Sequence, residues 1–284
     1  MSRISYVDGK YVEHENAYVH VEDRGYVFAD GVYEVALVIN DVLIDWKEHC
    51  ERLQNSLDGL KIDYQVSMFE LESIVKELAS RNNLNDAMIY LQITRGVAPR
   101  LHQFPKSDVK PVLSMTVSPF KLPSNESSNG VKAITLPDLR WKLRHYKTIS
   151  LLPNTMAKQE AVEAGAEEAI LYEEDGTVTE GSSTNVFIVD KEGCLFTHPA
   201  NKSILGGITR MGVVNVARED GINVKEEPFS LGILKEAKEV FITSTTKHVL
   251  PITNIDGKKV ADGEVGQVTK KIIELYSKYI NKQL

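Results

Sequence analysis

Glu180 is the first residue whose setting suggests chemistry. It lies in the segment 177–189, TVTEGSSTNVFIV, where a carboxylate, a glycine and three consecutive hydroxyls separate two stretches of strand-forming residues. A buried carboxylate needs a partner, or it takes up a proton. A pyridinium nitrogen would be such a partner. The alternative is a surface glutamate followed by hydroxyls that form turns.

Two other segments offer groups that could bind a phosphate. In GGITR, residues 206–210, two glycines precede Ile208 and Thr209 at the expected start of a helix. Free backbone N–H groups and the helix dipole favour an anion there. In ITSTTKH, residues 242–248, four hydroxyl residues follow an apolar strand and could also hold a phosphate. A plain loop capped by Thr209 and a solvated turn are the alternatives.

The fourth feature is the loop containing Arg100 and His102. Residues two apart in an extended segment point the same way, and an arginine grips a carboxylate with two donors. An exposed charged loop is the alternative. Pyridoxal phosphate requires three groups together: donors that bind its phosphate, a carboxylate beside its ring nitrogen, and a lysine. Lys142, Lys147 and Lys158 all lie nearby in the sequence, and composition does not choose among them.

Strands joined by tight turns must position these groups. Hairpins are predicted at Asp8-Gly9, Asn40-Asp41 and Asp175-Gly176, because such pairs suit the tight turns of hairpins. The segment 67–82 predicts a helix that begins with a Ser67/Glu70 capping box. Its apolar stripe is expected to contain Phe69, Leu71, Ile74, Val75 and Leu78. Further helices are predicted in 47–60, 157–165, 206–220 and 263–280, and further strands in 87–96, 110–118 and 239–252.

The chain length and a polar segment predict two domains. The chain has 284 residues, and a domain typically takes roughly 150. The segment 119–130, PFKLPSNESSNG, is rich in Ser, Asn and Pro and suits a linker. We therefore predict a small α/β domain over 1–118, a linker over 119–130 and a large cofactor-binding domain over 131–284. The expected class is α+β, with mostly antiparallel strands and flanking helices.

The composition of the chain limits which binding partners and which cellular location are expected. The formal net charge of -7 argues against nucleic acid or an anionic membrane as the main partner. Cys50 and Cys194 stand far apart, which predicts free thiols in a reducing compartment and no zinc or other metal site. The N-terminal residues lack the apolar core of a secretory signal, and no apolar run is long enough to cross a bilayer. A cytoplasmic protein is expected.

Several motifs occur in an order that resembles a known family. They are EDRGYVFADGVYEV (22–35), TRGVAPRLHQFP (94–105), AKQEA (157–161), TVTEGSSTNVF (177–187), THPAN (197–201), ILGGITR (204–210) and FITSTT (241–246). The chain is similar over nearly its whole length to the fold-type IV pyridoxal-phosphate enzymes, and closely to the D-amino acid aminotransferases. The resemblance implies a two-domain fold with pyridoxal 5'-phosphate at the domain interface.

The resemblance assigns the cofactor contacts. Lys147, in RHYKTIS, corresponds to the lysine that forms a Schiff base with the cofactor and moves the α-proton. Glu180 corresponds to the carboxylate that keeps the pyridine nitrogen protonated, and the loop after it would run along the edge of the cofactor. The residues expected around the phosphate and the ring are Arg52, Leu205, Ile208, Thr209, Ser244 and Thr245.

The resemblance also assigns the substrate contacts. Tyr33, Arg100 and His102 correspond to a trap for the substrate α-carboxylate, and Val35 would face the substrate. In the family Arg100 and His102 come from the neighbouring subunit, which implies a homodimer. The implied reaction moves the amino group of a D-amino acid, such as D-alanine, to a 2-oxo acid, such as 2-oxoglutarate, with ping-pong kinetics.

Three alternatives stay open from the sequence. A branched-chain L-amino acid aminotransferase has the same fold, but that family carries an arginine two positions after a strand tyrosine, where this chain has Gln92 after Tyr90. An aminodeoxychorismate lyase shares the fold and the lysine without transferring an amino group. A binding protein that keeps the fold without catalysis is disfavoured because Lys147 and Glu180 are both present.

Overall fold

The computed structural model describes residues 3–122 and 129–284, and the chain divides into two compact units. Unit 1 holds Met1–Lys121, Tyr146–Ser150 and Leu284, and unit 2 holds Leu122–His145 and Leu151–Gln283. Half of the predicted linker, residues 123–128, lies outside the described residues, and the predicted domain limits stay a prediction. No helix in the described ranges is long and apolar enough to span a membrane.

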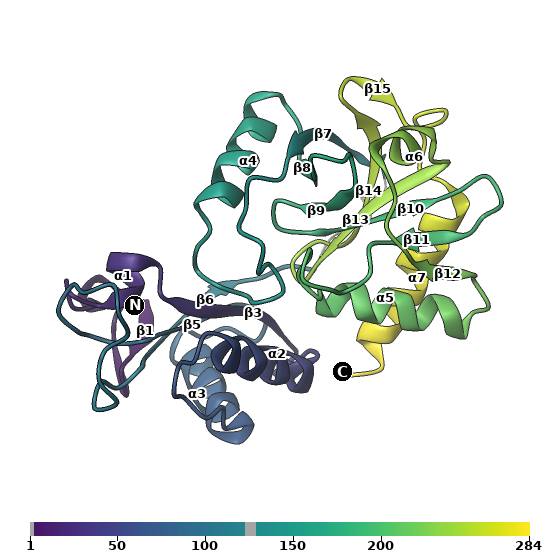
Figure 1. Ribbon diagram of the computed structural model, residues 1–284. Helices are drawn as coiled ribbons and strands as arrows, with labels where there is room; N and C mark the ends of the chain where they lie inside the picture. The colour runs from purple at the N-terminus through teal and green to yellow at the C-terminus, as the bar shows by residue number, and fades with distance from the viewer. Residues whose placement is uncertain (1–2, 123–128) are drawn as a thin grey trace. The chain divides into compact units, whose positions relative to one another are not determined.

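Unit 1 is an antiparallel sheet with its long helices on one face (Figure 1). The strand order is β2-β1-β6-β5-β3-β4. Its elements are β1 (Ile4–Val7), β2 (Lys10–Glu13), η1 (His14–Asn16), α1 (Arg24–Phe28), β3 (Gly31–Ile39), β4 (Val42–Leu43), α2 (Trp46–Gly59), α3 (Met68–Arg81), β5 (Ala87–Thr94) and β6 (Val112–Pro119). Helices α2 and α3 cover the sheet, and Leu57, Val75 and Leu78 pack there against Ile89 and Met115.

Unit 2 is built on a second, mixed sheet. The strand order is β12-β11-β10-β13-β14-β7-β8-β9, with β15 beside β14. Its strands are β7 (Val131–Pro137), β8 (Glu168–Tyr172), β9 (Val178–Gly181), β10 (Asn185–Val189), β11 (Leu195–Thr197), β12 (Val224–Glu226), β13 (Glu239–Ser244), β14 (His248–Ile255) and β15 (Lys258–Lys259). The pairs β11/β12, β14/β7 and β7/β8 are parallel and the other pairs are antiparallel.

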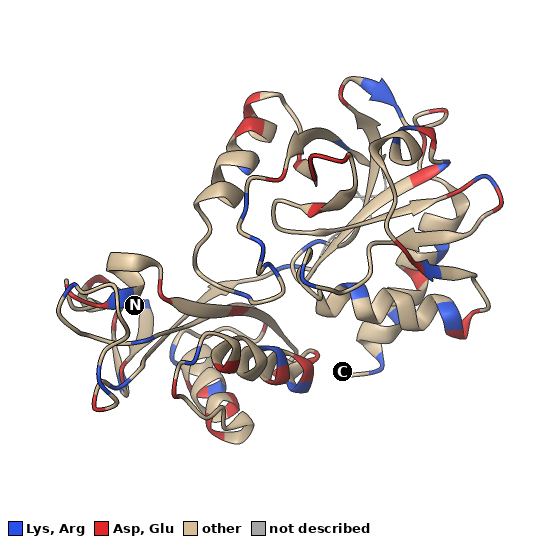
Figure 2. Cartoon of the chain, viewed as in Figure 1, with Lys and Arg blue, Asp and Glu red and all other residues tan. Residues whose placement is uncertain are grey.

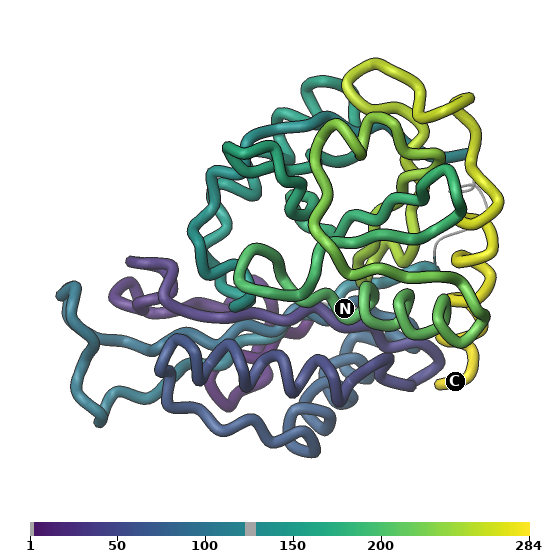
Figure 3. The backbone as a smooth tube through the Cα atoms, turned by 45° about the vertical axis from the view of Figure 1, so that its right-hand side comes forward, coloured from purple at the N-terminus to yellow at the C-terminus, as the bar shows by residue number. Residues whose placement is uncertain are grey.

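The described part of unit 2 also contains helices. They are α4 (Leu152–Glu163), α5 (Ile208–Glu219), α6 (Leu231–Glu236) and α7 (Gln267–Asn281). Helices α5 and α7 contact each other and cross at an angle in both views of the chain (Figures 1 and 3). They pack closely enough that a Cβ added to Gly212 would lie 3.0 Å from the Tyr276 ring. In each unit, basic residues are interspersed with acidic ones (Figure 2).

The predicted hairpins are confirmed, and their turn residues explain them. Asp8 and Gly9 have φ angles of 45° and 83°, and Asn40 and Asp41 have 49° and 63°. Such left-handed angles match the twist of two-residue hairpin turns. The turn before Thr177 joins β8 to β9, which pair antiparallel. The mostly antiparallel architecture expected from the sequence is therefore correct.

Ser67 caps the start of α3 as predicted, but one member of the predicted apolar stripe is wrong. The Ser67 side chain accepts from the Glu70 amide at 3.3 Å. Phe69 is 83% exposed. Residues three and four apart share a helix face, so Phe69 lies with Glu72 and Ser73 on the outward side. The buried side of α3 consists of Leu71, Ile74, Val75, Leu78 and Ala79.

Candidate active site

Lys147 lies in a short extended segment that pairs with β3 in unit 1. The Tyr33 amide donates to the Lys147 carbonyl at 3.0 Å, and the Ile149 amide donates to the Gly31 carbonyl at 3.1 Å. The Lys147 amide donates to the Ser56 hydroxyl of α2 at 3.0 Å. The lysine backbone is therefore fixed from two sides, by a strand and by a helix.

The Lys147 side chain lies over the Tyr33 ring. The Nζ atom is 4.2 Å from the ring centre, a cation–π distance. Tyr33 stacks on Tyr90 of β5, with ring centres 5.7 Å apart. The Tyr90 hydroxyl donates to Gln92 at 2.7 Å, and burial raises the Tyr90 pKa to about 12. Lys147 and Tyr33, two predicted site residues, are thus in contact.

Val35 shares the Tyr33 face of the sheet. Side chains two apart on a strand point to the same side. Val35 is half-buried and pairs in register with Tyr90, whose ring stacks on Tyr33. This face carries the predicted substrate residues of β3. The opposite face of β3 carries Glu34, which is buried under α2.

Arg52 is held by a buried carboxylate. Its Nε and Nη2 atoms donate to the two oxygens of Glu34, each at 2.8 Å. His49 Nδ1 lies 2.7 Å from the same carboxylate. Burial opposes the charge on Glu34, but Arg52 and then His49 outweigh that effect and hold the Glu34 pKa well below its ordinary value. Glu34 was not anticipated from the sequence. The signal that could have found it is its place in β3 beside Tyr33.

Arg100 and His102 lie together on an exposed loop of unit 1. The Phe28 ring at the end of α1 contacts both of them. The Arg100 guanidinium carbon is 5.3 Å from the ring centre, and the His102 ring centre is 5.5 Å away. Both side chains therefore lie against the same aromatic ring.

Glu180 is a buried carboxylate at the end of β9 in unit 2. Arg140 Nη1 donates to it at 2.5 Å, and the Asn185 side chain and the Leu205 amide each donate at 3.0 Å. Burial raises the pKa of the Glu180 carboxyl, although Arg140 and the Leu205 amide oppose the rise. Asn185 also donates to the Leu205 carbonyl at 2.9 Å. Glu180 and Leu205, both predicted, are thus joined through Asn185.

A network of buried charges continues behind Glu180. Arg140 Nη2 donates to Asp138 at 2.7 Å, and the Asp138 side chain has no exposed surface. Thr179 also donates to Asp138, at 2.7 Å, and Arg144 lies 3.4 Å from it. Burial raises the Asp138 pKa, but Arg140 outweighs it, so the net shift is downward. The sequence does not single out Asp138, Arg140 and Arg144, because they lie two to six positions apart in a loop, where charged residues follow no regular spacing.

The hydroxyls that follow Glu180 face a different carboxylate. Thr184 donates to Glu168 at 3.0 Å and Ser183 at 3.4 Å, and Ser182 donates to it through both its hydroxyl and its amide. Glu168 is 1% exposed and opens β8. The polar run in this segment is therefore explained within unit 2 by an acid that the sequence analysis had not singled out.

Ile208 and Thr209 form the first turn of α5, as predicted. Both are buried, and no side chain caps the helix start at Gly207. Four backbone N–H groups at a helix start lack partners within the helix. An added Cβ at Gly207 would collide with the Asn185 side-chain oxygen. The glycine therefore lets the helix start lie directly against the residue that holds Glu180.

Ser244 ends β13 and Thr245 follows it, and both are half-buried. The Ser244 hydroxyl accepts from the Lys247 amide at 3.2 Å, which closes a tight turn. The preceding Thr243 is buried beside Asn185 in the sheet register, and its hydroxyl finds no partner among the described residues. Hydroxyls at a strand end, one of them unsatisfied, suit an anionic ligand.

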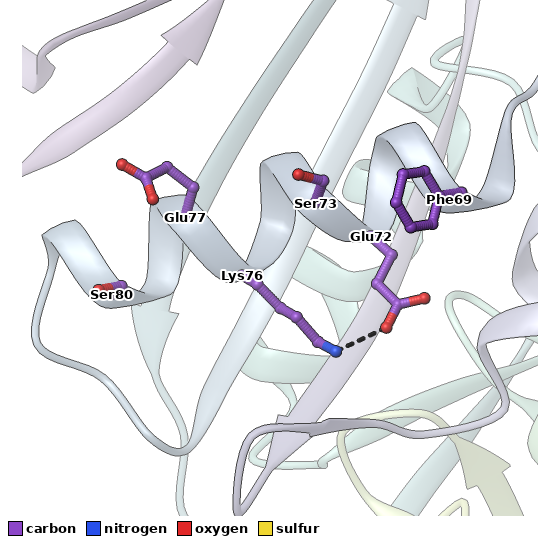
Figure 4. A pocket seen from close by; sticks show the side chains of 6 residues that line it. All are labelled: Phe69, Glu72, Ser73, Lys76, Glu77 and Ser80. Carbon is purple, nitrogen blue, oxygen red and sulfur yellow. Dashed lines mark ion pairs between the residues drawn. The ribbon is translucent and has the colours of Figure 1, made fainter.

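A surface depression elsewhere in unit 1 contains none of these residues. It lies along the outward face of α3, where Lys76 pairs with Glu72 at 2.6 Å (Figure 4). The side chains that line it are Phe69, Glu72, Ser73, Lys76, Glu77 and Ser80. Within the described ranges, no cluster of three His, Cys, Asp or Glu side chains is arranged to hold a metal ion.

Comparisons with known proteins agree with the geometry. Residues 31–255 match the family model of the class IV aminotransferases. The D-alanine aminotransferase of Staphylococcus haemolyticus is 41% identical over 278 residues, 98% of each chain. That of Bacillus licheniformis is 44% identical over 265 residues, 93% of each chain.

Solved structures support the same fold. The branched-chain amino acid aminotransferase of Escherichia coli has a TM-score of 0.90 and 26% identity, covering 100% of this chain and 96% of that one. The enzyme of Thermoproteus uzoniensis, solved with norvaline, has a TM-score of 0.87, 28% identity and the same coverage. A further branched-chain enzyme was solved with pyridoxamine 5'-phosphate and has a TM-score of 0.89 and 26% identity. This chain therefore belongs to the class IV aminotransferases, the fold-type IV enzymes that depend on pyridoxal phosphate.

Proposed function

We propose that this enzyme is a D-amino acid transaminase of the D-alanine type. The observation that carries the proposal is the identity of 41% to 44% with D-alanine aminotransferases over 93% to 98% of the chain. Transamination moves the amino group of a D-amino acid to a 2-oxo acid in two half-reactions. The small-molecule partners are therefore amino acids and 2-oxo acids.

The residues of unit 2 fit the cofactor. Burial raises the pKa of Glu180 even with Arg140 beside it, so a second cation would further favour the charged carboxylate, and a protonated ring nitrogen is such a cation. The uncapped start of α5 and the Ser244–Thr245 turn suit the phosphate. Bound pyridoxal phosphate supplies an aldehyde that links to amines and a cationic ring that stores the electron pair left by the departing α-proton.

Residues of unit 1 then serve proton transfer and binding. We assign the proton transfer to the Lys147 amine, which must be neutral when it acts as a base. Pairing of its backbone with β3 fixes the point from which the side chain extends. Arg52 is assigned to the phosphate, with Glu34 fixing its guanidinium plane. A bidentate pair of this kind removes most of the freedom of an arginine side chain.

Tyr33, Arg100 and His102 are assigned to the substrate α-carboxylate, and Val35 to the substrate side chain. Arg100 and His102 are exposed, so their donors are open to a carboxylate. The handedness of the substrate follows from the face on which its carboxylate is held relative to the lysine. A trap built from these residues is the arrangement that the D-specific resemblance implies.

A homodimer is part of the proposal. The loop that carries Arg100 and the neighbouring N-terminal segment expose apolar side chains that a second copy could cover. Tyr18, Val21 and Tyr26 are each more than 70% exposed, and Leu101 and Phe104 more than half. The bridge between Asp23 and Val97 holds the two segments side by side. Sedimentation at micromolar concentration tests the assembly. A cytoplasmic location stays a prediction from the sequence.

The activity is tested by comparing enantiomers. Purified enzyme with pyridoxal phosphate should convert D-alanine and 2-oxoglutarate to pyruvate and D-glutamate, while L-alanine should give little pyruvate. The Lys147→Ala variant is the matched blank, because it removes the assigned base and leaves the rest of the site. Equal rates with the two alanines would refute the D-specific assignment.

A branched-chain L-amino acid aminotransferase is the second candidate, favoured by the TM-score of 0.90 to the Escherichia coli enzyme. Against it, the position expected to be arginine is Gln92, which accepts a hydrogen bond from Tyr90 on the Tyr33 face. Turnover of L-leucine faster than D-alanine would support this candidate. Absence of any 2-oxo acid requirement would instead favour a lyase.

A further inference from the structure

Arg24 and Arg95 are buried arginines of unit 1 to which the preceding assignments give no role. Both donate to Asp30. Arg24 Nε binds the Asp30 Oδ2 atom at 2.8 Å, while Arg95 Nε and Nη2 bind the two oxygens at 2.8 and 2.9 Å. Asp30 directly precedes β3, the strand that carries Tyr33. We call these three side chains the Asp30 clamp.

The Asp30 clamp reaches the loop that carries Arg100 and His102. Arg24 Nη1 donates to the carbonyl of Leu101, the residue between them, at 2.7 Å. The Arg95 guanidinium carbon lies 3.7 Å from the centre of the Phe104 ring, further along the same loop. The loop is thus tied to the clamp at its middle and near its end.

The Phe28 ring adds a direct side-chain link. The Arg24 guanidinium carbon lies 4.7 Å from the ring centre, and Arg100 and His102 contact the same ring. The backbone of Arg24 is itself fixed, because its amide donates to the Gly96 carbonyl at 2.9 Å. A displacement of the Arg24 side chain would therefore move both the carbonyl and the ring that locate Arg100.

The clamp is also anchored to the end of α2. Arg95 donates to the carbonyl of Lys61 at 2.7 Å and to that of Leu60 at 2.8 Å. The exposed loop is thereby connected to the packed body of unit 1. An exposed loop of this kind would otherwise lose the geometry that carboxylate binding requires.

We propose that Arg24 is a positioning residue for substrate binding, which acts by holding the loop of Arg100 and His102 against the Asp30 clamp. The inference rests on the proposed carboxylate role of these two residues. Arg24 itself donates to the Asp30 carboxylate and to the Leu101 carbonyl, so its effect on a substrate passes through the loop.

The test uses the holoenzyme and the spectral change on mixing with D-alanine. Its concentration dependence gives a dissociation constant and a maximal rate. Arg24→Met should raise the dissociation constant roughly tenfold and change the maximal rate little, because the loop is displaced while the reacting groups are not. Arg81→Met is the control. Arg81 also pairs with a carboxylate, that of Glu77, and lies over an aromatic ring, Tyr11, but neither of these contacts involves the loop of Arg100 and His102.

A double-variant cycle separates positioning from direct binding. In the Arg100→Met background, Arg24→Met should raise the dissociation constant by a smaller factor than in the wild type, because only His102 is left for the loop to position. If the two substitutions raise the dissociation constant by factors that simply multiply in the double variant, the inference is wrong. It is also wrong if Arg24→Met leaves the dissociation constant unchanged while Arg100→Met raises it. An Arg100→Met variant that binds D-alanine normally would overturn the proposed trap and the inference with it. If Arg24→Met does not fold, Phe28→Leu carries the test, and it should raise the dissociation constant without slowing the maximal rate.

Discussion

The Lys147 Nζ atom lies 4.2 Å from the centre of the Tyr33 ring, and the backbones of the same two residues are hydrogen-bonded at 3.0 Å. The residue assigned to proton transfer and one assigned to substrate binding are therefore fixed to each other at two levels. A cation over an aromatic face gains ~0.5–2 kcal/mol, depending on its exposure to water. The ring of Tyr33 consequently influences where the Lys147 amine rests.

Two substitutions of Tyr33 separate its ring from its hydroxyl. Tyr33→Phe should raise the dissociation constant of D-alanine about tenfold, the size of one hydrogen bond to a charged group. The maximal rate should change little, since the ring under Lys147 remains. Tyr33→Leu removes the ring and should also slow the maximal rate. Stopped-flow mixing gives both constants, and equal maximal rates in the two variants would contradict this division of roles.

Glu180→Gln should slow the half-reaction with D-alanine roughly a hundredfold, as expected for loss of one group that stabilises developing charge. The amide keeps the shape of the side chain but cannot favour a protonated ring nitrogen. Glu226→Gln is the matched control, because Glu226 also pairs with a buried arginine, Arg210, of the same unit. That control should lose thermal stability and keep the half-reaction rate. A normal rate in Glu180→Gln would remove this glutamate from the mechanism.

Glu34→Gln should weaken cofactor affinity, because Arg52 loses the carboxylate that fixes its plane. Breaking a buried ion pair also costs ~3–5 kcal/mol of unfolding free energy. Absorbance titration of the apoenzyme with pyridoxal phosphate measures the affinity, and urea unfolding measures the stability. Glu77→Gln, which breaks the exposed pair with Arg81, should change neither by much. Unaltered cofactor affinity in a folded Glu34→Gln protein would argue against a phosphate role for Arg52.

Neighbouring glycines before α5 should respond differently to alanine. In Gly207→Ala the new methyl would collide with the Asn185 side chain, which holds both Glu180 and Leu205. Overpacking of this kind costs ~1–3 kcal/mol, and the half-reaction should slow. In Gly206→Ala the nearest atom is 3.8 Å away, an ordinary contact. Thermal unfolding should therefore distinguish the two variants, and equal melting temperatures would show that Asn185 moves freely.

Asp30 should contribute stability that acid removes. Burial opposes its charge, but Arg95 and Arg24 outweigh that effect, so the folded-state pKa of Asp30 lies below its ordinary value. A depressed pKa means that the contribution is complete above the unfolded pKa of about 4. It is lost as the pH falls through the folded value. Urea unfolding of the wild type and Asp30→Asn should differ most near neutral pH and converge in acid. A constant difference across the range would contradict the prediction.

Local patterns in the sequence were sufficient to predict the hairpins and most helices. Asp8-Gly9 and Asn40-Asp41 adopt the left-handed angles that their residue types favour. The outward Phe69 shows the limit, because an apolar residue near a helix start can belong to either face. Side chains that meet only after folding were beyond such reasoning. Glu168 and its hydroxyl donors lie up to 16 positions apart, and no sequence period links them.

The residues of the candidate site were predicted only where the motifs that contain them resemble those of a known family. The contact between Lys147 and Tyr33 joins residues more than 100 positions apart and follows from strand pairing, not from spacing. The supporting groups were missed for the same reason. Asp138 and Arg140 lie in a loop, where no periodic pattern marks them. Glu34 appears in the sequence only as one polar residue within an apolar strand.

Residues 146–150 belong to unit 1 although the chain on either side of them belongs to unit 2. The polypeptide therefore crosses between the units at 121/122, 145/146, 150/151 and 283/284. A gene divided after codon 121 would encode an N-terminal fragment in which β3 still pairs with β4 and β5 but lacks the segment that bonds to Gly31 and Tyr33, and a C-terminal fragment that carries that segment. Complementation between two such fragments would require residues 146–150 of the C-terminal fragment to pair again with β3 of the N-terminal fragment.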